Sequence, residues 1–350
     1  MIWLTWRQFQ PQAVIAVAAL AAFAVLLALT GPHLAGLYAS STIGSCHASD
    51  CSGPATDFLS ELNATATYGL LDLLGTVIIL IAPGVIGMFW GAPLIAGELE
   101  ANTHYLVWNQ SITRIRWLAV KLTLTGLAAM AVTEVLSVMQ TWWATPISRA
   151  VASGGTGTPI ALSQFSPLVF ASHGITPLGY AAFAFVLGVT AGVLLRRTVP
   201  AMALTLAVFA ALQIAMPLWI RPHLFPPDYT ITTLSSVSPP VPISVDLTSR
   251  TFTITAGGLT SQPEAWILAS GAVDASGNPV SAVPEACAHP QPFTGTGAIL
   301  DCLASNGIRE AVTYQPASRY WLFQATETAI YLALALALAG YCFWRLRRRL

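Results

Sequence analysis

Long apolar stretches alternate with polar segments along the whole chain. A helix that crosses about 30 Å of hydrocarbon needs about 20 predominantly apolar residues, whereas a spanning β-strand needs only about ten of alternating character. Uninterrupted apolar runs such as residues 332–339 fit the helical requirement. Six stretches satisfy it, over residues 13–30, 70–90, 122–143, 175–195, 198–220 and 321–344. The pattern therefore predicts an all-α polytopic membrane protein with six transmembrane helices.

The residues before the first apolar stretch have a different character. Trp3, Trp6 and Phe9 surround a lone Arg7, and Trp prefers the membrane–water interface. We expect a short amphipathic helix in the interface over residues 1–12, followed by the first five spans within residues 13–220. A cleaved secretion signal is the alternative, but such a signal needs a more basic start than one Arg.

Composition supports the membrane assignment and excludes several classes of protein. Hydrophobic residues make up 55% of the 350 residues and charged residues only 9%, whereas soluble domains carry about 25% charged residues. The mean hydropathy is +0.66. A soluble enzyme, a disordered chain and a basic nucleic-acid-binding domain are therefore excluded. Basic and acidic residues number 15 each, so only their distribution along the chain is informative.

Basic residues gather on one side of the predicted bundle. With six spans, both termini lie on the same side, and that side receives ten of the fifteen Lys and Arg residues: Arg7, Arg114, Arg116, Lys121, Arg196, Arg197, Arg345, Arg347, Arg348 and Arg349. Basic residues close to span ends favour the cytoplasmic side, which predicts cytoplasmic termini. We expect the sixth span and its basic tail, residues 320–350, to be anchored by anionic lipid headgroups.

The segments on the opposite side are richer in Ser, Thr, Pro and Gly. Residues 31–67 and 221–319 carry ten of the fifteen acidic residues. The second segment has about 99 residues, which is enough for a small domain of its own. Residues 229–233 and 251–255 alternate in polarity between turn formers. This alternation predicts some β structure in a large extracytoplasmic loop domain.

The cysteines agree with this topology. Cys46 and Cys51 share the first outer segment, and Cys287 and Cys302 share the last, so an oxidising space would join each pair in a disulfide. Cys342 falls in the sixth span and is interpreted as a small apolar filler. A metal site at the first pair, with the intervening His and Asp, is the alternative. No further ligand cluster is evident in the sequence, and we predict no metal.

The segment between the second and third spans, residues 91–117, is too polar to be a span itself. Glu98 and Glu100 are interleaved with apolar residues at helical spacing. This pattern predicts an amphipathic helix that rests on the cytoplasmic membrane surface. Arg114 and the basic residues after it return the chain to the bilayer.

The same segment resembles a known family, the membrane subunits of the second ABC-transporter permease superfamily, which are mostly exporters. Those subunits carry an acidic pair, then a Gly-Thr-like pair, a Ser/Thr-Arg ending and a Lys that opens the third span. Corresponding residues occur here in the same order, with Asn in place of the usual Gly: Glu98, Glu100, Asn102, Thr103, Ser111, Arg114 and Lys121. Both Gly and Asn tolerate a left-handed backbone.

A bacterial subgroup of that superfamily is similar over more of the chain. The shared features are residues 89–94, Trp108, Gln110, residues 116–117 and residues 319–324. The six-span layout, the interfacial N-terminus and the large last outer loop are similar too. The resemblance therefore extends over essentially the whole chain and implies a bacterial plasma membrane location.

The resemblance implies that residues 91–117 form a coupling element, which docks on a separate cytoplasmic ATPase subunit and passes its motion to the spans. The residues that would take part are those of the matching segment: Glu98, Glu100, Thr103, His104, Trp108 and Arg114. It further implies a second permease copy or a related permease as a partner. An ordinary interfacial helix with a solvated acidic face is the alternative interpretation.

An ATP site within this chain is not expected. A phosphate-binding loop needs Gly-x-x-x-x-Gly-Lys-Ser/Thr, and the single Lys of the chain, Lys121, stands between Val120 and Leu122. We therefore predict a transport subunit that is not an enzyme, has no catalytic residues and binds no cofactor itself. ATP and Mg would be bound by the partner ATPase.

Charged residues inside spans are costly, and each is a candidate functional residue. Glu134 lies in the middle of the third span, and Ser137 and Thr141 fall on the same side of that helix. This polar stripe lines a substrate path or a subunit interface, unless Glu134 is a protonated structural residue. Glu327 in the sixth span is a second candidate for the path, and pairing with Arg319 is its structural alternative.

Two functions fit these patterns. The first is the permease subunit of an ATP-driven ABC exporter, as in multidrug efflux, with a path enclosed by this chain and a second permease subunit. Its substrate is open among amphiphilic drugs, lipids, peptides and polysaccharides, and the pair is a homodimer or a heterodimer. The second is a membrane-anchored receptor or assembly protein with a ligand-binding outer domain and passive spans. The acidic segment and the polar stripe favour the exporter.

Overall fold

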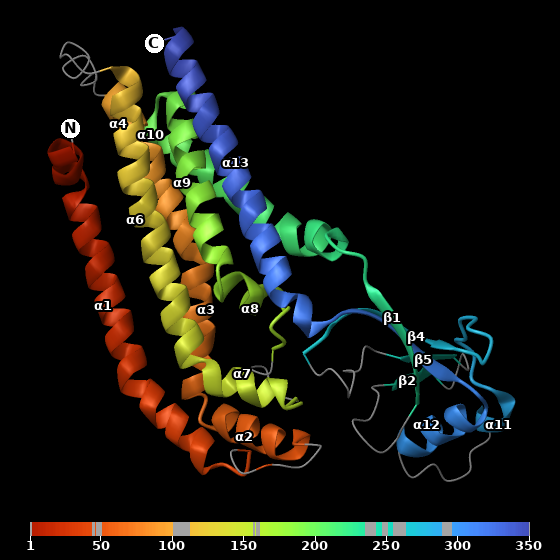
Figure 1. Cartoon of the computed structure of the whole chain (residues 1–350). Coiled ribbons are helices and arrows are strands. Elements are labelled where there is room, and N and C mark those ends of the chain that lie inside the picture. The colour runs from red at the N-terminus through yellow and green to blue at the C-terminus, as the bar shows by residue number, and fades with distance from the viewer. Residues whose placement is uncertain are drawn as a thin grey trace.

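The computed structural model describes residues 2–43, 46, 51–100, 113–156, 158, 162–234, 243–246, 251–254, 264–288 and 296–349. Within these residues, six helices are long and apolar enough to cross a membrane: Phe9–Ser40, Thr67–Glu98, Ile115–Trp143, Thr176–Leu195, Thr198–His223 and Ala317–Arg345. They correspond to the six predicted stretches. Figure 1 shows these helices side by side, with both chain termini at one end of the bundle, which we call the terminal end.

The first helix, α1 (Ile2–Ser40), runs without a break through Pro11 and Pro32. Residues 2–12, for which the sequence predicts a separate interfacial helix, are therefore the first turns of α1. The apolar surface of this helix is largely exposed in the single chain. A helix in that position is suited to contact with lipid or with another membrane helix.

The second span differs from its prediction because it is longer. Helix α3 (Thr67–Ile86) continues through a π-helical turn, η1 (Gly87–Gly91), into α4 (Ala92–Glu100). Residues 91–98 therefore form the end of a transmembrane helix, where the sequence predicts part of a surface helix. The apolar residues that suggested a membrane-facing surface, such as Ile95, are buried against neighbouring helices instead.

The third span, α6 (Arg114–Trp143), begins after Thr113, whose hydroxyl accepts a hydrogen bond from the Arg116 backbone N–H. The remaining spans are α9 (Thr176–Leu195), α10 (Thr198–Ala215) and α13 (Tyr320–Arg349). A π-helical turn η2 (Met216–Ile220) and a short 3-10 turn η3 (Arg221–His223) extend α10. Three shorter helices lie away from the terminal end (Figure 1), namely α2 (Ser52–Ala64), α7 (Thr145–Ala152) and α8 (Pro167–Ser172).

Helix α9 is the central helix of the bundle. It packs against α3, α4, α6, α10 and α13, and 78% of its most apolar window is buried. Glycines allow its closest approach, because an added Cβ at Gly188 would lie 2.2 Å from the carbonyl oxygen of Gly87. Gly192 faces the Ala92 carbonyl in the same way. Small residues at this spacing let two membrane helices pack backbone against backbone.

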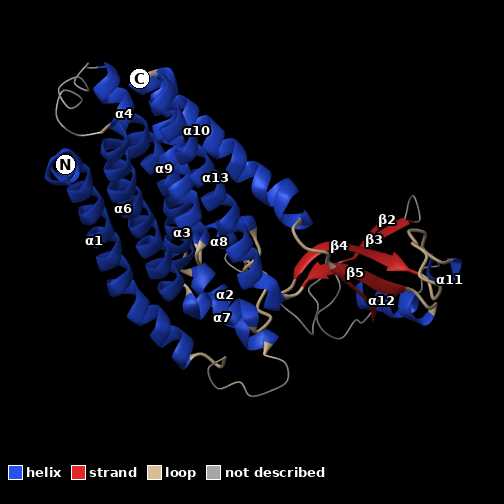
Figure 2. Cartoon of the chain, turned by 45° about the horizontal axis from the view of Figure 1, so that its top comes forward, coloured by secondary structure: helices blue, strands red, loops and turns tan. Residues whose placement is uncertain are grey.

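A small sheet domain follows the fifth span (Figure 2). Strands β1 (Asp228–Thr233), β5 (Arg309–Gln315) and β4 (Trp266–Val273) form an antiparallel sheet in the order β1-β5-β4. A second pair joins β2 (Ile243–Asp246) to β3 (Thr251–Ile254). Helices α11 (Glu285–Ala288) and α12 (Thr296–Ser305) complete the domain. Its core includes Phe252, Leu300 and Leu303. The two segments with strand-like alternation are strands β1 and β3.

Aromatic residues join the sheet domain to the bundle. Phe165, just before α8, stacks on Trp266 of β4, with 5.7 Å between ring centroids. Phe165 also meets Tyr320 and Phe323 at the start of α13. A short 3-10 turn, η4 (Ala317–Arg319), leads from β5 into α13. These contacts fix the direction in which the sheet domain leaves the bundle.

The cysteines are joined as Cys46–Cys51 and Cys287–Cys302, the same two pairs that the sequence predicts. The remaining cysteine, Cys342, is buried in α13 beside the Thr190 hydroxyl, at 3.3 Å. The first disulfide precedes α2, and the second connects α11 to α12 in the sheet domain.

We expect Gly188→Ala to destabilise the bundle and Gly340→Ala to leave it unchanged or slightly more stable. At Gly188 the new methyl group meets backbone atoms that cannot rotate away, whereas nothing lies within 4 Å of a Cβ at Gly340. Overpacking of this kind costs about 1–3 kcal/mol, while Ala is favoured over Gly in a helix by about 1 kcal/mol. Thermal unfolding of both variants in detergent tests this, and equal midpoints would contradict the close approach.

We also expect one free thiol, Cys342, when the denatured chain is titrated without a reducing agent. Reduction before titration should expose the four other cysteines. Four or more free thiols in the unreduced chain would exclude both disulfides.

Candidate functional site

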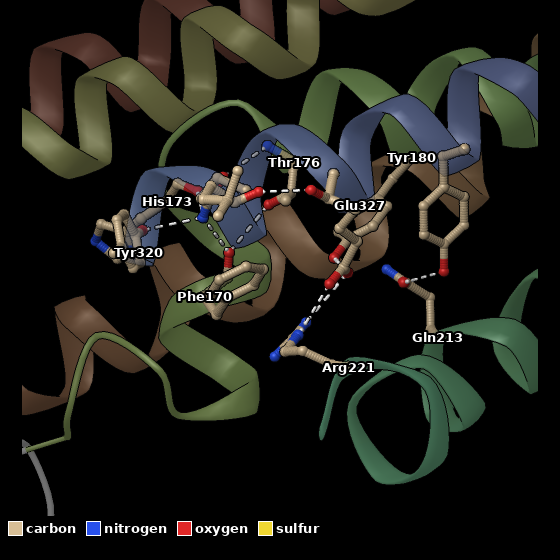
Figure 3. A network of polar contacts seen from close by, with 12 residues as sticks. Phe170, His173, Thr176, Tyr180, Gln213, Arg221, Tyr320 and Glu327 are labelled. Carbon is tan, nitrogen blue, oxygen red and sulfur yellow. Dashed lines mark hydrogen bonds and ion pairs between the residues drawn. The ribbon is translucent and has the colours of Figure 1, made fainter. Parts of the chain in front are cut away.

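A buried ion pair lies at the centre of a polar network between the spans. Arg221 of η3 donates to Glu327 of α13 through Nε, 2.9 Å from Oε2, and through Nη2, 3.1 Å from Oε1. Tyr180 of α9 donates its hydroxyl to the same carboxylate. The side chains of Arg221 and Glu327 are 1% and 0% exposed. Figure 3 shows the Arg221 side chain reaching Glu327 from a neighbouring helical segment.

The partner of Glu327 is therefore Arg221 and not Arg319, the alternative considered from the sequence. Arg319 faces the sheet domain, where it donates to Asp228 at 2.9 Å and to the Pro226 carbonyl at 2.8 Å. Sequence reasoning assigned Arg221 to the loop domain, because the apolar run ends just before it. The turns η2 and η3 instead carry Arg221 back against α13, so a residue 106 positions away supplies the counter-charge.

Gln324, one turn before Glu327, binds the start of α9. Its Oε1 accepts the backbone N–H groups of Ile175 and Thr176, both at 3.1 Å, and its Nε2 donates to the carbonyls of Phe170 and His173, also at 3.1 Å. The first N–H groups of a helix have no partner within that helix, and hydrocarbon offers none either. Gln324 therefore satisfies groups that would otherwise be unpaired inside the bundle.

The predicted stripe on α6 is divided between different roles. Ser137 donates to the carbonyls of Ser172 and Gly174, at 3.2 and 2.9 Å, and so binds α6 to the α8–α9 turn. Thr141 donates within its own helix, to the Ser137 carbonyl. Glu134 is half-buried, and its Oε2 has no hydrogen-bond partner among the described residues. No hydrogen bond within the described part of the chain joins this stripe to Glu327.

A second polar contact across α6 was not predicted from the sequence. Gln140 donates from Nε2 to Asp72 Oδ1 of α3, at 3.0 Å. The contact requires Gly75, because a Cβ there would lie 2.3 Å from the Gln140 Oε1. The residue that could have indicated this contact in the sequence is Gln140, one turn beyond Ser137. Its amide is uncharged and is easily overlooked beside the Glu134 carboxylate.

The acidic pair at the terminal end makes contacts within this chain. Glu98 forms an ion pair with Lys121 of α6, and the Lys121 ammonium also lies 4.9 Å from the centroid of the Trp117 ring. Glu100 accepts hydrogen bonds at Oε2 from the backbone N–H and hydroxyl of Thr198, at 3.1 and 2.8 Å. The two acids therefore connect the end of the second span to the third and fifth spans.

Glu100 thereby acts as a cap for α10. Arg197 at the N-cap position has no capping side-chain hydrogen bond, and the Glu100 carboxylate supplies the acceptor from a different helix. A carboxylate at a helix N-terminus is stabilised by the free N–H groups and the helix dipole. The Thr198 N–H is also the main reason that the pKa of Glu100 lies below its ordinary value.

The other predicted coupling residues are not placed by the structure. Thr103, His104 and Trp108 lie outside the described residues, and Arg114 begins α6 with a side chain that is not described. Among the described residues no group of three or more His, Cys, Asp or Glu side chains could hold a metal ion.

Six apolar helices with buried polar contacts between them define a multi-pass membrane protein. A family model described as ABC-2 membrane transporter related matches residues 17–221, which is more than half of the chain. The chain belongs to this family, so it is a permease-like transporter subunit of the kind that works with an ATPase subunit. No curated protein and no solved structure matches it.

We expect Glu327→Gln to lower the thermal stability far more than Asp228→Asn. Glu327→Gln leaves the Arg221 charge buried without a counter-charge, and removal of one member of a buried pair costs about 3–5 kcal/mol. Asp228 belongs to a partly exposed pair with Arg319, and such pairs contribute about 0–1 kcal/mol. Thermal unfolding in detergent compares the two near-isosteric variants.

The double variant Arg221→Met with Glu327→Leu should recover most of the lost stability, because apolar residues of similar volume replace buried pairs well. Equal stability of Glu327→Gln and Asp228→Asn would contradict a buried ionic pair.

Proposed function

We propose that this chain is the permease subunit of an ATP-driven exporter of amphiphilic molecules. Two permease subunits, identical or related, would enclose the path, and separate ATPase subunits would bind ATP and Mg at the cytoplasmic side. The observation that carries the proposal is the pair of contacts made by Glu98 and Glu100, since they link the segment after the second span to two other spans.

These contacts offer a mechanical route from an ATPase to the membrane helices. The segment that leads away from Glu100 toward α6 contains Thr103, His104 and Trp108, the residues proposed to dock on the ATPase. A displacement of that segment acts directly on α4, which is continuous with α3. The Glu98–Lys121 pair passes the displacement to α6, and the Glu100–Thr198 bonds pass it to α10.

The charge at the terminal end supports a cytoplasmic location for this coupling site. Five basic residues lie in the parts of their helices nearest the terminal end of the bundle: Arg7, Lys121, Arg196, Arg197 and Arg345. Basic residues next to span ends favour the cytoplasmic side. The opposite end, with the disulfide-containing sheet domain, would then lie outside the cytoplasm.

Co-purification from native membranes after mild detergent extraction tests the proposal. An assembly of this chain with a soluble nucleotide-binding subunit, active in ATP hydrolysis, is the expected result. A chain that purifies alone, with no ATPase beside it, would favour a receptor whose sheet domain binds the ligand.

We expect Glu98→Gln and Glu100→Gln to reduce substrate-stimulated ATP hydrolysis by about fivefold or more, the lower end of the usual range for coupling between sites. Both variants remove a charge-assisted contact with little change in volume. Glu61→Gln on α2, an exposed acid at the opposite end, is the matched control. Normal stimulation in assembled complexes of both variants would contradict the coupling role.

The Glu100 contact should also persist in mild acid. Because the folded pKa lies below the ordinary value of 4.5, the stabilisation from this contact is complete above that value. It is lost as the pH falls through the lowered pKa. Stimulated hydrolysis by the wild-type complex should therefore show no loss that depends on Glu100 between neutral pH and about pH 5.

A further inference from the structure

A pocket lies where the fifth span bends away from the bundle. Its volume is about 290 Å³. Leu80 of α3, Leu168 of α8 and Leu218 of η2 are among the apolar residues that line it, and its polar lining consists of Tyr180, Gln213 and Arg221. Leu168 and Leu218 are also partly exposed on the surface of the single chain, at 39% and 58%. The pocket therefore borders a surface that faces lipid or another membrane helix.

Two hydrogen-bond donors at this pocket have no partner among the described residues, Arg221 Nη1 and Gln213 Nε2. The rest of the Arg221 side chain is fully engaged, since Nε and Nη2 donate to Glu327 and the guanidinium carbon lies 3.8 Å from the centroid of the Phe170 ring. A buried donor without an acceptor is unfavourable in an apolar surrounding. These two groups are therefore the part of the network that a ligand would complete.

The other polar groups at the same place already make hydrogen bonds within the chain. Gln213 Oε1 accepts from the Tyr331 hydroxyl at 3.3 Å, and the Tyr180 hydroxyl donates to Glu327. Figure 3 shows Gln213 and Arg221 rising from one helical segment toward the network. The pocket consequently offers N–H groups to a ligand and calls for an oxygen acceptor.

Charge decides which acceptor fits best. Glu327 already neutralises Arg221 through two hydrogen bonds, so a second carboxylate or a phosphate would leave an uncompensated negative charge in a low-dielectric site. An uncharged carbonyl oxygen accepts the same hydrogen bonds without that penalty. The apolar lining favours a hydrocarbon chain attached to the carbonyl group. The volume is at the lower limit for small-molecule sites, about 300 Å³, so an ester group with the first part of one acyl chain fits and a whole phospholipid does not.

We propose that this pocket binds the carbonyl group of an acyl ester, with the ester oxygen accepting from Arg221 Nη1 and Gln213 Nε2. The first part of the acyl chain then packs against Leu80, Leu168 and Leu218. The ester comes from a bilayer lipid that enters from the side or from a free amphiphile. The site is contained in one chain and needs neither an ATPase nor a second permease.

Photolabelling of the full chain in phosphatidylcholine vesicles tests the site. One probe is a phosphatidylcholine with a diazirine in an acyl chain, and the other is a methyl ester of the same diazirine fatty acid. Saturable labelling of residues 167–171 and 214–218, displaced by unlabelled methyl ester, is the expected result. Labelling by the phosphatidylcholine probe identifies a bilayer lipid as a source, whereas labelling by the methyl ester alone identifies a free amphiphile.

Variants separate the pocket from general contact with lipid. Leu168→Trp fills the pocket, and Gln213→Met removes one donor at similar volume, so each should lower the labelling by about fivefold or more. Leu204→Trp, at a 41% exposed position of α10 outside the pocket lining, is the matched control and should label like the wild type. Gel filtration and thermal unfolding establish that each variant is folded. If Gln213→Met does not fold, Leu168→Trp still tests the pocket.

Three results would overturn the proposal. Labelling that does not saturate would mean that the two donors bind only solvent. Equal labelling of Leu168→Trp and the wild type would place the probe outside the pocket. Displacement by the free fatty acid at pH 8 as effective as by its methyl ester would exclude selection for an uncharged carbonyl. None of these results bears on the coupling to an ATPase, because the assay contains no ATPase.

Discussion

The close packing of α9 against the second span is the interaction on which the rest of the structure depends. Gly188 and Gly87 bring two helix backbones into contact, with no space for a side chain between them. Lipid provides no hydrophobic force that would hold two membrane helices together, so such contacts and interhelical hydrogen bonds must do so. Gln324 secures the start of α9, and Glu100 binds Thr198 shortly after its end. Close backbone packing holds the middle of α9 in place, and polar contacts hold the chain at its two ends.

The Arg221–Glu327 pair determines how the fifth and sixth spans meet near the sheet domain. Isolated charges inside a bilayer are very costly, but this pair is bidentate and receives a third hydrogen bond from Tyr180. The same geometry leaves Arg221 Nη1 without an acceptor beside an apolar pocket. One ion pair thus joins the fifth and sixth spans and also leaves the donor that carries our proposal for the pocket.

The acidic pair binds within its own bundle, where the sequence suggested contact with a partner protein. The sequence placed Glu98 and Glu100 at the coupling segment through a motif, and it suggested that they point toward a partner protein. The structure instead directs Glu98 to Lys121 and Glu100 to Thr198, so these acids bind the segment to its own bundle. In the coupling role that we propose, residues further along the segment contact the ATPase, and the two acids transmit the movement.

The sequence by itself determined the six spans, the two cysteine pairs and two of the strands. Length, hydropathy and alternation are local properties, and the membrane allows a long apolar stretch only one simple structure. Tertiary structure alone decided that Glu327 pairs with Arg221 and not Arg319, that Gln324 caps α9, and that residues 91–98 extend a span. The first two outcomes depend on which helix faces lie together across 106 or more residues of chain, and the third depends on the packing of α4 against α9. No local pattern encodes such contacts.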